Sequence, residues 1–425
     1  MRTSLLFATL LLAGAVHAAP STARKAAPAA PAVPTEIELS HQLEEAQAER
    51  LQPLVERFNA TQKDYHVVLS RRVEGDAPKL LNLVTREEMS RFVANRGKFK
   101  PLSEVMREAR EPLDATRLSP ELRVGLADGK GRLAALPVAL STPVLYYNKE
   151  AFRKAGLDPA VPPRTWWEVQ QAADKLFDAG SLCPYTTSWP AWVHIDNTSA
   201  WNGADVADGK GRLAFNGLLQ IKHIALLNSW YKSRFFIYFG RRDEADQRFA
   251  AGECGMLTSS SALYATIHDK PGLDVGVSTL PYHDDVRGAP QQTLADGASL
   301  WIGSGRKPAE YKGAARFVSF LLAPDVQVAL TSAGGFLPMT PVARAAASSR
   351  LLKDDVSALN VASRQLDGKG ALRSLRVSQV EPVRIIVEEE LETVWANRKP
   401  AKAALDDAVV RGNAVLPAAL KASPL

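Results

Sequence analysis

The segments EIELS (residues 36–40) and YHVVL (residues 65–69) decide the fold class. The first alternates polar and apolar residues and the second is a short apolar run, so both predict β-strands. Between them Leu54, Val55 and Phe58 recur at helical spacing. A strand, a helix and a strand within about 35 residues form a βαβ unit, which favours a parallel sheet.

The same alternation continues along the chain. A capping box formed by Thr165 and Glu168 predicts a helix start, because each side chain satisfies an otherwise unpaired backbone amide. Further strands are predicted at 132–139, 143–147 and 254–258, and further helices at 217–230, 243–251, 307–322, 385–395 and 402–415. Strands and helices in alternation predict an α/β fold.

Composition narrows the class of protein. The 425 residues are 46% hydrophobic and 23% charged, as in a soluble globular protein, which argues against disordered, collagenous and disulfide-stapled chains. The formal net charge of +6 comes without any run of Lys and Arg, so nucleic acid is not the expected partner. The length predicts two or three domains.

The N-terminus predicts export. Arg2 precedes an apolar run from Leu5 to Val16, and a small-residue site ends at Ala18, so residues 1–18 are predicted to be a signal peptide cleaved near Ala18. An uncleaved anchor is the alternative. Residues 19–35 are rich in Ala and Pro and are predicted to be a linker. No later stretch is long and apolar enough for a membrane helix, so we expect a soluble exported protein.

No motif for catalysis or metal binding is present in the sequence. HExxH, GxSxG, GxGxxG and Walker patterns are all missing, so an enzyme such as a secreted hydrolase is the least favoured class. The triplet at residues 283–285 (His-Asp-Asp) predicts an exposed turn rather than a metal site. Cys183 and Cys254 allow either one disulfide or two buried thiols, and the sequence does not choose.

Two stretches are candidate binding elements. Within residues 249–264 a short strand leads into the serines at 259–261 just before a helical run. Such serines offer hydroxyls and free amides to an anion, or they simply cap their own helix. Trp189, Trp192 and Trp201 fall in a segment predicted to be loop-rich, where aromatic rings either stack on a ligand or belong to the core.

The segment PVLYYNKEAF (143–152) resembles the YYNK segment of extracellular solute-binding proteins of ABC importers, in the sugar-type branch. RFAAGECGM (248–256) is similar to the same family. More narrowly, the chain resembles members of that family that bind sn-glycerol-3-phosphate, from about residue 36 to 416. The matching segments, in order, are 141–143 (STP), 189–192 (WPAW), 199–203 (SAWNG), 240–244 (GRRDE), 297–301 (GASLW), 335–338 (GFLP) and 383–391 (VRIIVEEEL).

The resemblance implies a two-lobed, Venus-flytrap α/β fold, each lobe a sheet flanked by helices. It implies one lobe at 36–142 plus about 290–335 and another at 143–289 plus about 336–425. Hinge closure would bury a small anionic or polyol ligand and present a surface to a membrane permease in the periplasm. The resemblance implies a monomer with no catalysis, no cofactor and no metal.

The resemblance assigns the family's ligand-binding positions to individual residues of this chain. The matching residues are Ser141, Trp189, Ser260 or Ser261, Gly297 and Arg384. Hydroxyls, amides and a guanidinium fork suit an anionic group.

Three positions depart from the family pattern. A segment that carries a tyrosine is missing after Arg72, a glutamate is replaced by Thr85, and a second tyrosine is replaced by Phe336. We therefore expect the anion-binding half of the cleft to be kept and the hydroxyl-binding half to be rebuilt. The expected ligand is an anionic polyol such as glycerol-3-phosphate or a glycerophosphodiester. The alternatives are an uncharged sugar, or a diverged protein that acts as a sensor or interaction module.

Overall fold

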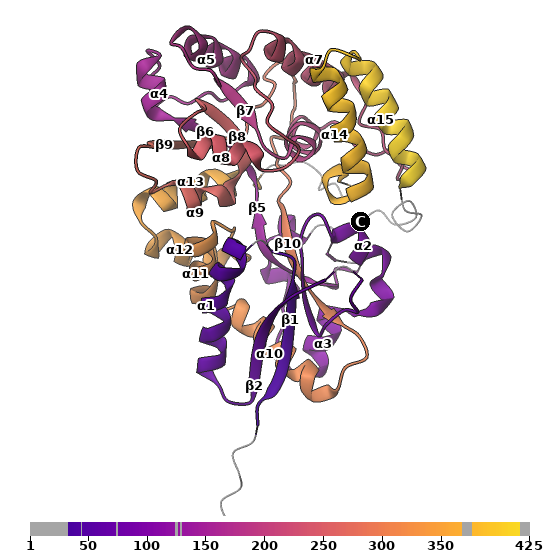
Figure 1. Ribbon diagram of the computed structural model, residues 1–425. Helices are drawn as coiled ribbons and strands as arrows, with labels where there is room; N and C mark the ends of the chain where they lie inside the picture. The colour runs from indigo at the N-terminus through magenta and orange to yellow at the C-terminus, as the bar shows by residue number, and fades with distance from the viewer. Residues whose placement is uncertain are drawn as a thin grey trace, which may run out of the picture.

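A computed structural model describes residues 33–43, 45–73, 75–123, 126–127, 130–367 and 376–416. Two sheets occupy opposite ends of the molecule, each with its own helices, and β5 and β10 run between them (Figure 1). The predicted signal peptide and most of the predicted linker lie outside the described residues. The α/β, two-lobed architecture predicted from the sequence is confirmed.

The first sheet contains β1 (Thr35–His41), β2 (Tyr65–Arg71), β3 (Leu81–Val84), β4 (Phe99–Lys100), β5 (Leu136–Ser141) and β10 (Asp296–Gly303). The strand order is β2-β1-β3-β10-β4, and β5 also pairs with β10. β1 is parallel to β2 and β3, which confirms the predicted βαβ unit, whereas β10 is antiparallel to β3, β4 and β5. β5 lies a few residues later than the strand predicted at 132–139.

The second sheet contains β6 (Pro143–Asn148), β7 (Tyr185–Thr187), β8 (Met256–Ser260) and β9 (Val275–Thr279), in the order β7-β8-β6-β9. β7 is parallel to β8, and β6 is antiparallel to β8 and β9. Only Thr142 separates β5 of the first sheet from β6 of the second. The chain therefore passes between the two halves of the molecule at this residue.

The first sheet is covered by α1 (Glu45–Thr61), α2 (Met89–Ala94), α3 (Leu102–Glu108), α10 (Pro308–Leu321) and α11 (Pro324–Gly334). Ile37 of β1, Phe58 of α1 and Phe317 of α10 lie in one apolar core. The rings of Phe58 and Phe317 meet edge to face, with centroids 5.1 Å apart. The helical spacing in α1 thus places its apolar face against the sheet.

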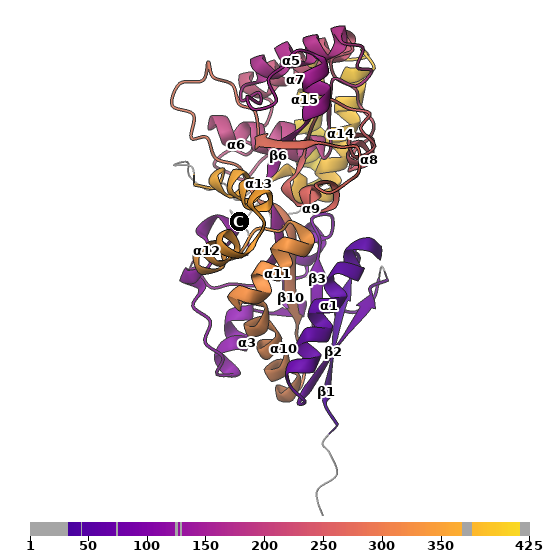
Figure 2. The same cartoon turned by 90° about the vertical axis from the view of Figure 1, so that its left-hand side faces the viewer.

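The remaining helices are α4 (Lys149–Lys154), α5 (Trp166–Asp178), α6 (Thr198–Asn202), α7 (Leu218–Lys232), α8 (Glu244–Ala250), α9 (Tyr264–Ile267), α12 (Pro341–Arg350), α13 (Lys353–Arg364), α14 (Glu381–Trp395) and α15 (Ala401–Val415). The predicted capping box opens α5: Thr165 Oγ1 accepts from the Glu168 amide, and Glu168 accepts from the Thr165 amide. Figure 2 shows α12 and α13 at the junction of the two halves, where α12 packs on α11 and α13 on β9.

Short helical turns complete the described chain. They are η1 (Arg96–Lys98), η2 (Ala115–Arg117), η3 (Pro120–Arg123), the π-helix η4 (Ala191–Asn197), η5 (Ser261–Leu263) and η6 (Val377–Gln379). A continuous apolar cluster joins Phe92 of α2 and Trp301 of β10 to Trp192 of η4 and Val383 of α14. The two halves are therefore in packed contact in this structure.

Within the described residues, no single helix is long and apolar enough to cross a membrane. α10 and α11 taken together are long and apolar enough, but the two helices are bent by 71° at the break between them.

Candidate functional site

The three predicted serines meet where the two sheets join. β5 ends at Ser141 and β8 at Ser260, and their hydroxyl oxygens lie 2.7 Å apart. Ser261 Oγ accepts a hydrogen bond from the Thr142 amide at 3.2 Å. Ser260 Oγ also accepts from the Ala262 amide, so this serine caps its own turn as well. A hydroxyl can donate once and accept twice, so the Ser141–Ser260 pair retains capacity for a ligand.

Gly297 lies beside this serine pair, because its neighbour Asp296 is opposite Ser141 in the β5–β10 register. The φ angle of Gly297 is +148°, a backbone conformation that residues with a Cβ rarely adopt. A Cβ there would lie 2.0 Å from the carbonyl oxygen of Ala139. Glycine is therefore required for β10 to approach β5 at this point.

Phe336 also lies next to β5. The amide of its neighbour Leu337 donates to the carbonyl of Leu140 at 2.8 Å. Gly335 precedes it with a φ of +64°, and a Cβ there would lie 2.7 Å from the carbonyl oxygen of Ala262. The backbone on either side of Phe336 thus contacts β5 and the serine turn, and its half-buried ring has no hydroxyl to offer.

Trp189 faces an arginine that the sequence analysis did not select. Trp189 has a φ of +55°, and its amide donates to the carbonyl of Arg242 at 2.8 Å. The guanidinium carbon of Arg86 lies 4.9 Å from the centroid of the Trp189 ring system and 4.2 Å from that of Trp192. Both distances are within the range of cation–π attraction.

Trp189 lies in a bend, as predicted, but the chain from residue 190 to 202 is helical, so the predicted loop was wrong for Trp192 and Trp201. Trp192 lies in the π-helix η4 and Trp201 in α6, and both are buried. Trp201 stacks on Tyr282, with ring centroids 6.0 Å apart. A π-helix has no strong sequence periodicity to reveal it. Of the three tryptophans, Trp189 alone is only partly buried.

Arg384 is buried at the start of α14 and is held by two carboxylates. Its Nε and Nη2 donate to Glu381 at 2.8 and 2.5 Å, and its Nη1 donates to Glu388 at 2.7 Å. Burial raises the pKa of Glu388 to about 7, although the guanidinium of Arg384 opposes this shift. Arg384 is connected to Trp189 indirectly, because Arg242 lies 3.6 Å from Glu381.

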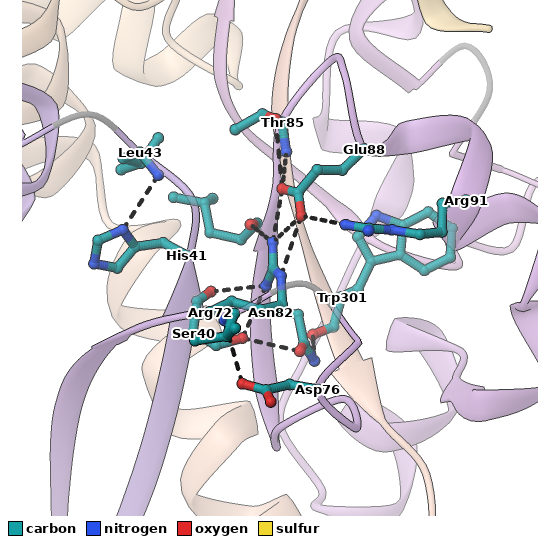
Figure 3. Close-up of polar contacts among 12 residues, drawn as sticks. Ser40, His41, Leu43, Arg72, Asp76, Asn82, Thr85, Glu88, Arg91 and Trp301 are labelled. Atoms are coloured by element: carbon teal, nitrogen blue, oxygen red, sulfur yellow. Dashed lines mark hydrogen bonds and ion pairs between the residues drawn. The ribbon is translucent and has the colours of Figure 1, made fainter. Parts of the chain in front are cut away.

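Thr85 belongs to a buried polar network at the end of β3 (Figure 3). The Thr85 amide donates to Glu88 Oε2 at 3.1 Å, and Arg72 Nη2 pairs with Glu88 Oε1 at 2.5 Å. Arg72 also donates to the Ser40 hydroxyl at 2.8 Å. Glu88 thereby fixes the turn that follows β3, and Arg72 holds Glu88 in place.

Arg86 and Asp296 are the site residues that sequence reasoning missed. Arg86 Nε lies 2.9 Å from Asp296 Oδ2, and both side chains are buried. Asp296 also accepts hydrogen bonds from Ser378 and Gln379 of η6, both at 3.2 Å. A single arginine after a strand and a single aspartate before a glycine form no motif. The signal that could have drawn attention to them is their position next to Thr85 and Gly297.

The eight predicted positions are linked through shared contacts, but Arg384 is connected to the others only through Glu381 and Arg242. Ser141, Ser260, Ser261, Gly297 and Phe336 surround the ends of β5 and β8, while Trp189, Thr85 and Arg384 approach through Arg86 and Arg242. Hydroxyls, a tryptophan ring and guanidinium groups converge where the two halves meet, which is chemistry for holding a small polar molecule.

His283 corrects another prediction. The triplet at 283–285 is a turn whose two aspartates are exposed, but His283 itself is buried. Its Nε2 lies 3.1 Å from His223 Nδ1, and His223 Nε2 lies 2.9 Å from His194 Nδ1. Burial lowers the pKa of His194 to about 3 and that of His283 to about 4. Among the residues described, no group of three His, Cys, Asp or Glu side chains could hold a metal ion.

Cys183 and Cys254 form a disulfide between the segments that precede β7 and β8. Their Cα atoms are 4.6 Å apart. Of the two alternatives left open by the sequence, the structure thus contains the disulfide.

Comparisons with known proteins show the family to which the chain belongs. The family of bacterial extracellular solute-binding proteins matches residues 46–358. The sn-glycerol-3-phosphate-binding periplasmic protein UgpB of Yersinia pseudotuberculosis is 37% identical over 90% of this chain and 92% of its own length. UgpB of Salmonella typhimurium is 37% identical over 92% of this chain and 94% of its own length.

Solved structures share the fold. UgpB from Mycobacterium tuberculosis in complex with glycerophosphocholine has a TM-score of 0.73 at 19% identity, and the match covers 90% of this chain and 98% of that one. Maltose-bound MalE3 of Thermotoga maritima has a TM-score of 0.72 at 17% identity, with 90% and 100% covered. The chain therefore belongs to the family of bacterial extracellular solute-binding proteins.

Proposed function

We propose that this chain is the periplasmic substrate-binding component of an ABC importer. Its ligand is an anionic polyol such as glycerol-3-phosphate or a glycerophosphodiester, held without chemical conversion. The observation that carries the proposal is the meeting of Ser141, Ser260, Gly297 and Trp189 with guanidinium groups where the two sheets join. Relatives at 36–37% identity that are named for binding sn-glycerol-3-phosphate support it.

Each part of the site has a role in this proposal. The hydroxyls of Ser141 and Ser260 and the backbone at Gly297 hydrogen-bond ligand oxygens, and the ring of Trp189 covers the carbon chain. Phe336 offers an apolar wall where a tyrosine would offer a hydroxyl. Cleavage near Ala18 releases a monomeric protein, which delivers its ligand to a membrane permease.

We also propose the division into lobes. One lobe comprises residues 36–142 and about 290–335, and the other comprises 143–289 and about 336–425. The passage from β5 to β6 at Thr142 supports a hinge there, because a single residue separates strands of different sheets. The ligand would stabilise the closed arrangement by contacting both lobes.

A thermal-shift screen of the mature chain tests the ligand class. Glycerol-3-phosphate, glycerophosphocholine and maltose are compared, each from 0.01 to 10 mM. A ligand at about 100 times its Kd stabilises the folded state by about 2.7 kcal/mol, so a phosphate ester should raise the Tm in a concentration-dependent way. Maltose should leave it unchanged. A rise with maltose alone, or with none of the three, would contradict the proposal.

An uncharged sugar is the second candidate ligand, and one observation favours it. Arg384, the arginine that the sequence assigned to the anion, already donates to Glu381 and Glu388. If no other cation served the ligand, the site would suit an uncharged molecule. The maltose arm of the screen separates the two candidates.

A further inference from the structure

Arg86 belongs to the half of the molecule that holds the first sheet, and its side chain reaches the other half. The residue lies between β3 and α2 and is 7% exposed. Its guanidinium carbon lies over the ring system of Trp189, 4.9 Å from the centroid, and over that of Trp192 at 4.2 Å. Both tryptophans come from the segment between β7 of the second sheet and α6. One side chain thus joins the two proposed lobes.

This contact between the lobes combines two favourable features. A cation gains more from an aromatic ring when both are out of water, and Arg86 and Trp192 are both buried. Asp296 of β10 lies 2.9 Å from Arg86 Nε, so the buried charge has its counter-ion within its own lobe. The ion pair therefore compensates the charge of Arg86, while the two rings supply the contact across the junction.

The turn that carries Arg86 is held by a buried ion pair (Figure 3). Glu88 accepts from the Thr85 amide at 3.1 Å and pairs with Arg72. Arg72 in turn donates to the carbonyl of Leu83 at 2.9 Å. The chain is therefore fixed to the first lobe both before and after Arg86, so the guanidinium moves with that lobe.

The backbone of Trp189 needs support from its neighbours. Its φ angle is +55°, a conformation that is strained for a bulky residue and persists only where the surroundings hold it. The Trp189 amide donates to the carbonyl of Arg242 at 2.8 Å, and Arg86 lies against the ring. Because Trp189 is only partly buried, part of it remains open to a ligand. Arg86 therefore helps to orient the ring that the proposed function assigns to the ligand.

We propose that Arg86 is a positioning residue for ligand binding, whose guanidinium docks on Trp189 and Trp192 when the lobes close and thereby stabilises the closed state. The inference rests on the proposed function and deepens it, since it names a residue that couples closure to the ligand-facing tryptophan. Arg86 acts through the two tryptophans and does not touch the ligand. Its loss therefore weakens the binding of every ligand by a similar factor.

Isothermal titration calorimetry measures the effect on binding. The mature chain and its variants are titrated with glycerol-3-phosphate and, separately, with glycerophosphocholine. R86A should bind both about 5- to 30-fold more weakly and by similar factors, because a buried cation–π contact is lost from the closed state. R86K keeps a cation near the rings and should fall between. R117A removes an equal charge from an exposed position of the same lobe and should bind like the unchanged chain.

Closure itself is measured by double electron–electron resonance. Spin labels are attached at K63C in one lobe and K154C in the other, both at exposed positions. Cys183 and Cys254 are joined in a disulfide and are not labelled. With and without saturating glycerol-3-phosphate, R86A should hold a larger population at the distance of the open arrangement than the chain with Arg86 intact. A residue that only stabilised the fold of its own lobe would leave these distances unchanged.

The outcomes separate the inference from the function on which it rests. If the unchanged chain binds a phosphate ester and R86A binds it equally well, or shows the same distances, the role of Arg86 is overturned while the proposed function stands. A loss confined to one of two bound ligands would overturn it too, because it marks a direct contact. If the unchanged chain binds neither probe, both proposals fall. If R86A does not fold, R86Q removes the cation, keeps more of the side chain and decides by the same two measurements.

Discussion

Arg86 and Arg384 are both buried, yet their surroundings differ. Arg384 on α14 is enclosed by two carboxylates of its own helix, which accept from three of the five N–H donors of its guanidinium. Arg86 has one carboxylate at its edge, two tryptophans at its face and unused donors. The difference teaches that an arginine's availability depends on its neighbours, so residue type alone does not assign an anion site.

The comparison predicts first a large difference in stability. Arg384→Ala should lower the free energy of unfolding by about 3–5 kcal/mol, because it leaves Glu388 buried without its cation. Arg86→Ala also leaves a buried carboxylate without its ion-pair partner but should cost less, about 2–3 kcal/mol, since Asp296 keeps its hydrogen bonds from Ser378 and Gln379 and the attraction of Arg376. Urea denaturation followed by circular dichroism measures both. Equal losses in the two variants would mean that both arginines are structural.

The second prediction concerns pH and is specific to the Arg384 region. The pKa of Glu388 is raised to about 7 in the folded protein by burial, above its value in the unfolded chain. The folded state therefore holds this proton more tightly, and the resulting stability is lost as pH rises from about 4.5 through 7.

Glu388→Gln removes this dependence. Between pH 5 and pH 8 the unchanged chain should lose about 2 kcal/mol of stability relative to the variant. Urea midpoints at both pH values give the difference. The buried histidines His194 and His283 have the opposite effect on the pH dependence of stability. Their lowered pKa values reduce the stability as pH falls below about 6.5. Because Glu388→Gln keeps these histidines, the difference between the variant and the unchanged chain gives the contribution of Glu388 alone.

The smallest expected effect is on affinity when Glu381 is neutralised. Glu381→Gln weakens the hold on Arg384 without changing Arg86. If Arg384 donates to the anion through its remaining N–H groups, the Kd for glycerol-3-phosphate should fall by about three- to tenfold. The matched control is Glu389→Gln, which removes an exposed carboxylate of the same helix that pairs with Arg411. An unchanged Kd for Glu381→Gln, or an equal change in both variants, would show that Arg384 does not bind the anion.

Much of the fold was predictable from local patterns. The βαβ unit, the capping box at Thr165 and the alternation of elements follow from periodicity and turn chemistry, which are properties of neighbouring residues. The boundary of β5 was shifted by a few residues, because its pairing with β10 joins segments far apart in sequence. The π-helix at 191–197 was missed, since no periodic signal marks it.

The sequence predicted which residues belong to the site, but it did not predict which side chains pair with one another. The resemblance brought Ser141, Ser260 and Gly297 to attention, and the structure places them side by side. It could not show that Arg384 is already paired, nor that Arg86 reaches the tryptophans, because both facts depend on side-chain contacts between distant elements.

A structure of the chain bound to glycerol-3-phosphate tests the central claim most directly. The account predicts the phosphate between the two sheets, with one oxygen within hydrogen-bond distance of a guanidinium group and another near the hydroxyl of Ser141 or Ser260. A phosphate that contacts no arginine, or a ligand bound away from the junction of the sheets, would contradict it.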